Sequence, residues 1–157
     1  MTTIAERLKK LGITLPEAAA PAANYTPFVL HAGVLTVSGQ LPMENGAVTH
    51  TGLLGDGVDV PDGQTAARLC AINILAQIQA ALGSLEQVER VIRLGGFVAA
   101  TPTFTDHPMV VNGASDLIAE VFGDAGVHAR VAVGVASLPF GACVEVDAMV
   151  AVRAPDA

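Results

Sequence analysis

The sequence predicts an α+β fold in which one β-sheet has helices on a single face. Residues 63–82 have apolar side chains at helical spacing and are followed by Gly83, a common C-terminal stop. A second helical pattern, over residues 108–122, ends in the same way at Gly123. Strand-like alternation follows over residues 128–152. Because both helices can cover one apolar sheet face, the pattern favours an α+β layer architecture.

The N-terminal 27 residues are predicted to form a short helix and an extended arm. Thr3 and Glu6 have the spacing of a capping box, and apolar residues continue at helical spacing to Leu11. Residues 14–27 are rich in Ala and Pro and show no sustained period. We expect an arm that lies against the body of one domain spanning residues 1–157.

Shorter alternating segments predict four more strands. They span residues 28–32, 34–38, 47–52 and 88–101. Asp62 is expected to precede the first long helix. Gly95 and Gly96 interrupt the last of these segments, so a bulge or a close backbone approach is expected there.

The segment 128–152 contains two alternating halves joined by Leu138-Pro139-Phe140-Gly141, which predicts an antiparallel hairpin. Side chains switch faces at every residue, so the valines of both halves can share one surface. Arg130, Glu145 and Asp147 would then share the other surface. A tight turn would leave Arg130 about 13 Å along the ladder from the position opposite Glu145. That gap suits a small anion, a water, a bulge or a neighbouring subunit better than a direct ion pair.

Length and composition predict one soluble globular domain. The chain has 157 residues, of which 52% are hydrophobic and 15% are charged. Its mean hydropathy of +0.53 is high, but no apolar run approaches the roughly 18 residues of a membrane helix. The first 12 residues lack the pattern of a signal peptide, so we expect a cytoplasmic protein with no membrane partner. Cys70 and Cys143 are expected to be buried thiols, although one disulfide is the alternative.

The charge balance argues against a nucleic-acid partner. A net charge of -7 and a pI near 4.8 leave few cations to neutralise phosphates. The four histidines, His31, His50, His107 and His128, are scattered without ligand spacing. We therefore predict no metal, and no phosphate-binding loop indicates a cofactor.

Several of these motifs together resemble the YjgF/RidA family of reactive intermediate deaminases. They are the run from Arg130 to Glu145 with Leu138-Pro139 inside it, Ser38-Gly39-Gln40-Leu41-Pro42, the helix between Gly63 and Gly83, and Gly96-Phe97-Val98. Some members of the family have the older label L-PSP endoribonuclease. The resemblance implies a chorismate-mutase-like fold with a mixed sheet, two main helices on one face and a short N-terminal helix. It also implies a homotrimer with a pocket at each subunit interface.

The sheet pattern alone also predicts self-association. Two helices can shield only one face, and a monomer rarely exposes a large semi-apolar patch. The uncovered face is expected to include Arg130, Ala132, Gly134, Cys143 and Met149.

Arg130 and Glu145 are the central candidate site residues. Arg130 begins an otherwise apolar strand, where it is either a structural interface ion pair or a bidentate clamp for a substrate carboxylate. Glu145 is either a capped edge carboxylate or, if partly dry, a group that holds a proton near neutral pH and positions a water. The resemblance implies the clamp for Arg130 and the water-activating role for Glu145. Asp147 is expected to be solvated or interfacial.

Four further residues match family positions that line the pocket. Ser38 and Gly39 offer a hydroxyl and backbone N–H groups at a strand end, and Tyr25 stands before them. Asn112 matches a family asparagine, although it is equally a candidate for a helix-face amide. Ala132 departs from the family, because many deaminases have a cysteine there.

We therefore expect hydrolysis of reactive 2-imino or enamino acids to 2-keto acids and ammonia, without a cofactor. The alternative is a regulatory trimer that binds small carboxylates and performs no turnover. Ala132 and the N-terminal helix make that alternative plausible. Endoribonuclease activity ranks third because the chain is acidic.

Overall fold

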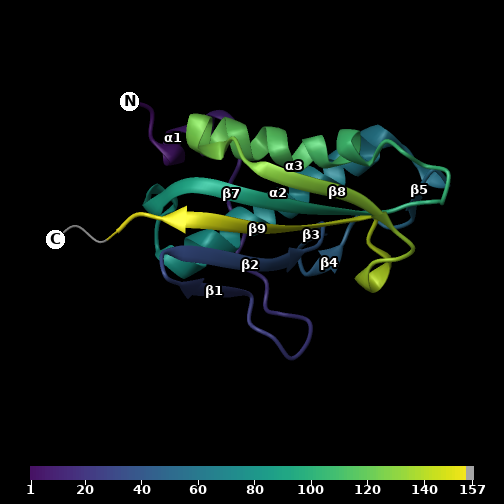
Figure 1. Ribbon diagram of the computed structural model, residues 1–157, viewed down its shortest axis with the longest axis horizontal. Helices are drawn as coiled ribbons and strands as arrows, with labels where there is room; N and C mark the ends of the chain where they lie inside the picture. The colour runs from purple at the N-terminus through teal and green to yellow at the C-terminus, as the bar shows by residue number, and fades with distance from the viewer. Residues whose placement is uncertain (155–157) are drawn as a thin grey trace.

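The protein, described here by a computed structural model over residues 1–154, has a five-stranded sheet with two long helices on one face (Figure 1). The strand order is β1-β2-β9-β7-β8, in which only β7 and β8 are parallel. The predicted mixed sheet and α+β class are confirmed. The helices and strands are α1 Ile4–Lys10, β1 Phe28–His31, β2 Val34–Gln40, β3 Met43–Glu44, β4 Ala47–Val48, β5 Leu53–Leu54, β6 Gly57–Val58, α2 Val60–Leu82, β7 Val88–Ala99, α3 His107–Phe122, β8 Ala129–Val135 and β9 Val144–Val152, with short 3-10 turns at Leu85–Gln87, Gly123–Gly126 and Pro139–Gly141.

The hydrophobic core lies between the sheet and helices α2 and α3. Burying a large aliphatic side chain in such a core contributes about 1.5–3 kcal/mol. The core side chains that are almost completely buried include Leu35, Ile74, Leu75, Leu94, Leu117 and Val146.

The N-terminal helix and arm form as predicted. The Thr3 side chain accepts a hydrogen bond from the Glu6 N–H, and the Glu6 carboxylate accepts one from the Thr3 N–H. Arg7 then donates to the Val121 carbonyl at 3.1 Å, which ties α1 to the end of α3. The arm that follows has no helix or strand between residues 12 and 27.

Helix α2 begins three residues before the predicted start. Asp59, and not Asp62, is the N-cap, and its carboxylate accepts from the Asp62 N–H at 2.9 Å. Pro61 is in the first turn, where its missing N–H costs no helical hydrogen bond. The end of the helix is as predicted, with Gly83 in the left-handed region at φ 76°.

Helices α2 and α3 approach closely at Gly113. A Cβ on this glycine would overlap the Gln64 carbonyl oxygen and lie 2.9 Å from the Gln64 Cα. Because the obstacle is backbone, Gly113→Ala must push the two helices apart. We expect a loss of about 1–3 kcal/mol of unfolding free energy, the usual cost of overpacking. Thermal unfolding should show a fall of about 2–4 °C in Tm per kcal/mol.

Gly63→Ala is the matched control, since Gly63 is also helical. Its Cβ would meet the ends of the Val110 and Leu54 side chains at 3.0 and 3.1 Å, and these can move. Equal melting temperatures for the two variants would contradict the close helix crossing.

The predicted hairpin between the last two strands is wrong. Strand β7 lies between β8 and β9, pairing in parallel with β8 and antiparallel with β9. Helix α3 provides the crossover from β7 to the parallel strand β8. The turn at Pro139–Gly141, with Phe140 at φ 57°, therefore leads the chain past the end of β7.

The faces of the two strands differ from the prediction for the same reason. Arg130 is in register with Leu94, and Leu94 with Ala148, so Arg130 faces the helices. Glu145 is in register with Phe97, and Phe97 with Val133, so Glu145 is on the other side of the sheet. The valines of β8 thus share a face with Glu145 and Asp147, and Arg130 does not.

Two other strand predictions need correction. The segment 47–52 forms only β4, which pairs with β3 outside the main sheet. The register shifts of β7 are between Val88 and Arg93, and not at the two glycines. A close approach does occur there, because a Cβ on Gly96 would lie 2.6 Å from the Val111 Cγ1 atom.

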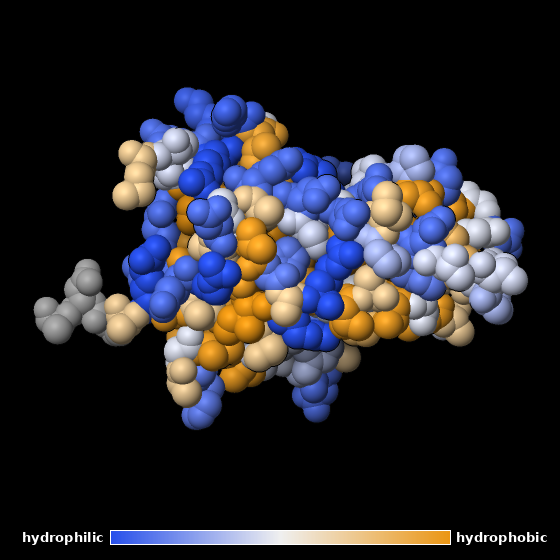
Figure 2. All heavy atoms as spheres, turned by 45° about the horizontal axis from the view of Figure 1, so that its top comes forward, coloured by the Kyte–Doolittle hydropathy of each residue, from blue (hydrophilic) through white to orange (hydrophobic). Residues whose placement is uncertain are grey.

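The face opposite α2 and α3, called the open face here, is semi-apolar as predicted but has a different composition. Val29 and Val133 on it are 52% and 39% exposed. Arg93 and Asp147 form an ion pair near its centre at 3.2 Å. Hydrophobic residues also gather in patches, with hydrophilic ones between them, on the surface seen in Figure 2. The open face includes Val29, Thr36, Arg93, Phe97, Val133, Glu145, Asp147 and Met149.

Helix α2 is long and apolar enough to cross a membrane by length and composition alone. Within residues 1–154 it is the one helix that meets this test, and 56% of the relevant window is buried inside the fold. Burial against the sheet and α3 accounts for its apolar character.

Candidate functional site

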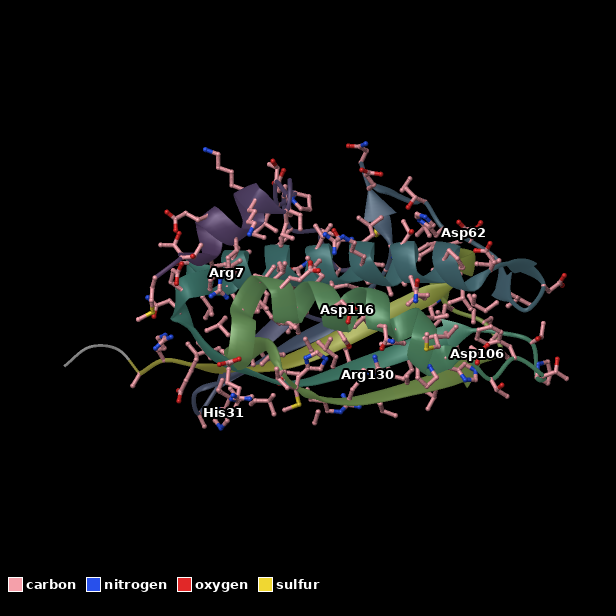
Figure 3. All side chains as sticks on the ribbon, turned by 90° about the horizontal axis from the view of Figure 1, so that it is seen from above. Arg7, His31, Asp62, Asp106, Asp116 and Arg130 are labelled. Carbon is pink, nitrogen blue, oxygen red and sulfur yellow. The ribbon has the colours of Figure 1, made fainter. Side chains whose placement is uncertain are left out.

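Arg130 is fixed between the edge strand β8 and helix α3. Its Nη1 donates to the Asn112 Oδ1 at 2.8 Å and to the Ser115 Oγ at 3.1 Å. Its Nη2 donates to the Pro108 carbonyl at 3.3 Å. The structure therefore brings Arg130 and Asn112 together, and Figure 3 shows Arg130 beside the middle of α3, near Asp116.

The acceptors that hold Arg130 are all neutral. Among residues 1–154, no carboxylate forms an ion pair with it. Both Nη1 hydrogens are used, which leaves Nε–H and one Nη2–H for a ligand. These two groups can lie on the same edge of the guanidinium, so a carboxylate can bind there in bidentate fashion.

Ser115 and His128 belong to the same cluster, although the sequence did not single them out as site residues. The His128 Nε2 lies 3.0 Å from the Ser115 Oγ, and its Nδ1 contacts the Gly126 carbonyl oxygen. Ser115 follows Asn112 by three residues in α3, and His128 precedes Arg130 by two in the chain. Both spacings place side chains on one face, which is the signal that could have identified them.

Glu145 is half-buried on the open face, at the start of β9. Burial raises the pKa of its carboxyl above the usual value, and the nearby Asp147 carboxylate raises it further. The carboxyl group occupies the space where a Gly39 side chain would be, since a Cβ there would overlap the Glu145 Oε1. The Gly39 Cβ would also lie 2.9 Å from the Glu145 Cδ. Strand β2 can approach Glu145 this closely only with glycine at position 39.

Gly39 lies where the pairing of β2 with β9 shifts register, between Val37 and Gln40. Ser38, beside it, holds the arm: its hydroxyl donates to the Thr26 carbonyl at 2.7 Å. The Ser38 hydroxyl proton is thus already used within the chain. The oxygen keeps its capacity to accept a hydrogen bond.

Tyr25 stands on the arm close to the same strand end and is 50% exposed. It lines a cavity of about 270 Å³ together with Gly39, Met43 and Phe140. The cavity wall is mainly apolar side chains from the arm and from the 39–43 segment. Gly39 thus contacts Glu145 on one side and lines the cavity with Tyr25 on the other, and Ser38 precedes Gly39 in β2.

The two halves of the predicted site do not meet within one chain. Strand β7 separates β8 from β9, and Glu145 is three residues from the level of Arg130. At ordinary strand spacings their Cα atoms are roughly 14 Å apart, with the side chains on opposite faces. A ligand of a few atoms cannot contact both. The predicted common surface for Arg130 and Glu145 is therefore wrong for the single chain.

The two cysteines are free and buried, as predicted. Burial raises the pKa of Cys143 to about 11, so its thiol is protonated at neutral pH. Burial also raises the pKa of the Cys70 thiol, and this thiol contacts the Val144 carbonyl at 3.7 Å. Neither has the character of a reactive thiolate.

Comparisons with known proteins agree on one family. The model of the family described as "YjgF/chorismate mutase-like, putative endoribonuclease" matches residues 5–150. Protein TCP17 of Trypanosoma cruzi is 55% identical over 148 residues, which are 94% of this chain and 92% of TCP17. The crystal structure of Atu1372 from Agrobacterium tumefaciens, a protein of unknown function, is 57% identical, with a TM-score of 0.90 over 96% of this chain and 92% of that one. TdcF of E. coli, solved with bound serine, is 25% identical, with a TM-score of 0.63 over 88% of this chain and 94% of that one.

Proposed function

The chain belongs to the YjgF/chorismate mutase-like family, and we propose that it hydrolyses reactive 2-imino or enamino acids to 2-keto acids and ammonia. The observation that best supports this proposal is the environment of Glu145. Its carboxyl is half-buried, has a raised pKa and lies directly against the backbone of Gly39. Such a group keeps its proton to a higher pH than an exposed carboxyl does, and it can pass that proton to a bound substrate.

The proposed reaction needs two functions from the protein. The Arg130 guanidinium binds the substrate carboxylate through its Nε–H and its remaining Nη2–H. Glu145 donates a proton to the imine nitrogen, and its carboxylate then takes a proton from the water that adds to the imine carbon. The resulting carbinolamine loses ammonia, and its C–N bond is replaced by the C=O of the 2-keto acid. No cofactor is required in this scheme, because the imine carbon is already electrophilic.

The separation of Arg130 from Glu145 supports a site between subunits. Arg130 is on the edge strand β8. Gly39 is in β2, near the opposite edge of the sheet, and Tyr25 is on the arm that leads into β1 and β2. If the β8 edge of one subunit lies beside the β2 side of the next, the two halves of the site face each other. We propose a homotrimer, in which the semi-apolar open faces are buried and three such sites form.

The trimer makes a direct prediction for the protein in solution. Multi-angle light scattering at micromolar concentration should give three times the 16.0 kDa mass of the chain, because the exposed apolar groups of the open face need partners. A stable monomer under these conditions would remove the interfacial site and, with it, the proposed mechanism.

A trimer that binds small carboxylates without turnover is the second candidate function. Two observations favour it: the serine bound to TdcF is a small amino acid with a carboxylate, and Ala132 removes the thiol common in family deaminases. The assay that separates the candidates is ammonia release from freshly generated 2-iminopropionate, with Arg130→Ala beside wild type. Release above the spontaneous rate by wild type alone supports the enzyme. Ligand binding without such release supports the regulatory trimer.

Endoribonuclease activity is the third candidate, and the charge of the chain argues against it. With a net charge of -7, the protein should bind RNA negligibly at physiological salt. Fluorescence anisotropy with a labelled single-stranded RNA checks this prediction. Salt-sensitive micromolar binding, together with cleavage of the RNA, would reverse the ranking.

We further propose a cytoplasmic location. The two free thiols, Cys70 and Cys143, suit a reducing compartment.

A further inference from the structure

We propose that Ser115 and His128 are positioning residues, which act through one hydrogen-bonded chain to hold Arg130 in the orientation that binds a carboxylate. The inference rests on the proposed function, because it concerns the same clamp. It adds two residues with no direct part in the chemistry and assigns each a definite donor or acceptor role.

The chain of hydrogen bonds has one consistent direction when His128 is neutral. The Gly126 carbonyl can only accept, so the His128 Nδ1 that contacts it must hold the proton. The Nε2 is then an acceptor, and it receives the Ser115 hydroxyl proton at 3.0 Å. This tautomer is assigned from the hydrogen-bond network.

The His128 tautomer affects Arg130 because it fixes the orientation of the Ser115 hydroxyl group. With its proton committed to His128, the Ser115 Oγ turns its lone pairs to the Arg130 Nη1, at 3.1 Å. A serine without a defined acceptor could rotate its own proton toward the guanidinium. His128 therefore selects the serine rotamer that accepts from Arg130.

Fixing Nη1 in this way determines which edge of the guanidinium is free. The Asn112 Oδ1 takes one Nη1 hydrogen and the Ser115 Oγ takes the other. An incoming carboxylate then finds the Nε and Nη2 edge preorganised, which lowers the entropic cost of binding. The same cluster lines a surface cavity of about 290 Å³, in which Asp116 is the nearby acid.

The test is the dissociation constant for 2-oxobutanoate, a stable carboxylate of the product class, measured by calorimetry on the intact protein. Ser115→Ala should weaken binding about 3- to 10-fold, the worth of about one hydrogen bond. Alanine is favourable in a helix, so the fold should tolerate this change. Ser115→Thr keeps the hydroxyl and should restore most of the affinity.

His128→Ala should weaken binding by a similar factor, and the double variant Ser115→Ala/His128→Ala should be no weaker than Ser115→Ala alone. His128 acts only through the serine in this proposal, so the two effects should not add. A purely structural role would give additive losses. His31→Gln is the matched control, since His31 is exposed on β1 and lies well apart from Arg130 in Figure 3.

Two readouts separate this proposal from the proposed function. If imine hydrolysis gives these variants a raised KM and an unchanged kcat, they act on binding alone. Nitrogen-15 NMR of the free protein should show His128 as the Nδ1–H tautomer. Wild-type affinity in Ser115→Ala, additive losses in the double variant, or the Nε2–H tautomer would overturn the positioning role. If Arg130→Ala binds 2-oxobutanoate as well as wild type does, the clamp itself is refuted.

Discussion

Glu145→Gln should lower the kcat of imine hydrolysis by about 10²- to 10⁴-fold, the usual contribution of a general acid or base. The amide is nearly isosteric with the carboxyl group but cannot donate and recover a proton. The space against Gly39 stays filled, because the side-chain shape is kept. KM should change little, since substrate binding depends mainly on Arg130. Steady-state ammonia release, measured on variants that remain trimeric, checks both parameters.

Glu89→Gln is the matched control, because Glu89 is an exposed strand carboxylate on β7. It should keep wild-type kcat and KM. Wild-type turnover in a trimeric Glu145→Gln protein would dismiss Glu145 as the catalyst.

The raised pKa of Glu145 also has consequences for pH dependence. If the protonated carboxyl is required, kcat should fall as the pH rises through that pKa. The free energy of unfolding should also fall as the pH rises. A carboxyl whose pKa is higher in the folded chain than in the unfolded chain binds its proton more tightly in the folded chain. Folding is therefore favoured below the unfolded-chain pKa, and the protein loses stability as the pH rises through the folded-chain pKa.

Glu145→Gln removes this titration, so the stability of the variant relative to wild type should increase from pH 4 to pH 8. Melting temperatures measured across this range test the sign. A relative stability that falls with pH would mean that the carboxylate, and not the acid, is the form favoured by the fold.

The sequence was sufficient for several features that depend on neighbouring residues, although it placed the N-cap of α2 at Asp62 instead of Asp59. The capping box of Thr3 and Glu6, and the stop of α2 at Gly83, are set by local hydrogen bonds and backbone conformation. The closeness of Arg130 to Asn112 was suggested only by the family resemblance. The structure supplies the atoms that make this contact.

The pairing of the last two strands, β8 and β9, could not be predicted from local sequence patterns. Alternation shows which side chains share one face of a strand, but not which strand is its neighbour. The turn at Pro139–Gly141 has the composition of a hairpin, yet β7 lies between the strands that it joins. One inserted strand was enough to separate Arg130 from Glu145.

Ser115 and His128 were missed as site residues for a related reason. A serine on a helix and a histidine before a strand are common, and their spacings from Asn112 and Arg130 do not show that the two residues contact each other. They become significant only because α3 lies against β8, which aligns the His128 ring, the Ser115 hydroxyl and the Arg130 guanidinium.

Arg130→Lys should raise KM about 10- to 100-fold with little change in kcat, if Arg130 only anchors the substrate carboxylate. Hydrogen bonds to a charged group are worth about 1.5–3 kcal/mol. An ammonium has three donors, and the acceptors from Asn112, Ser115 and Pro108 can occupy all of them. The lysine variant therefore keeps the charge but has no pair of free donors for a carboxylate.

Arg68→Lys is the matched control for this change, because Arg68 forms a partly exposed ion pair with Glu120 at 3.6 Å on the helices. It should leave both kinetic parameters at wild-type values. Arg130→Ala, which also loses the charge, should bind substrate more weakly than Arg130→Lys. A large fall in kcat for a trimeric Arg130→Lys protein at saturating substrate would show that the guanidinium stabilises the transition state as well as the bound substrate. The clamp and the acid would then share the catalysis that is here assigned to Glu145.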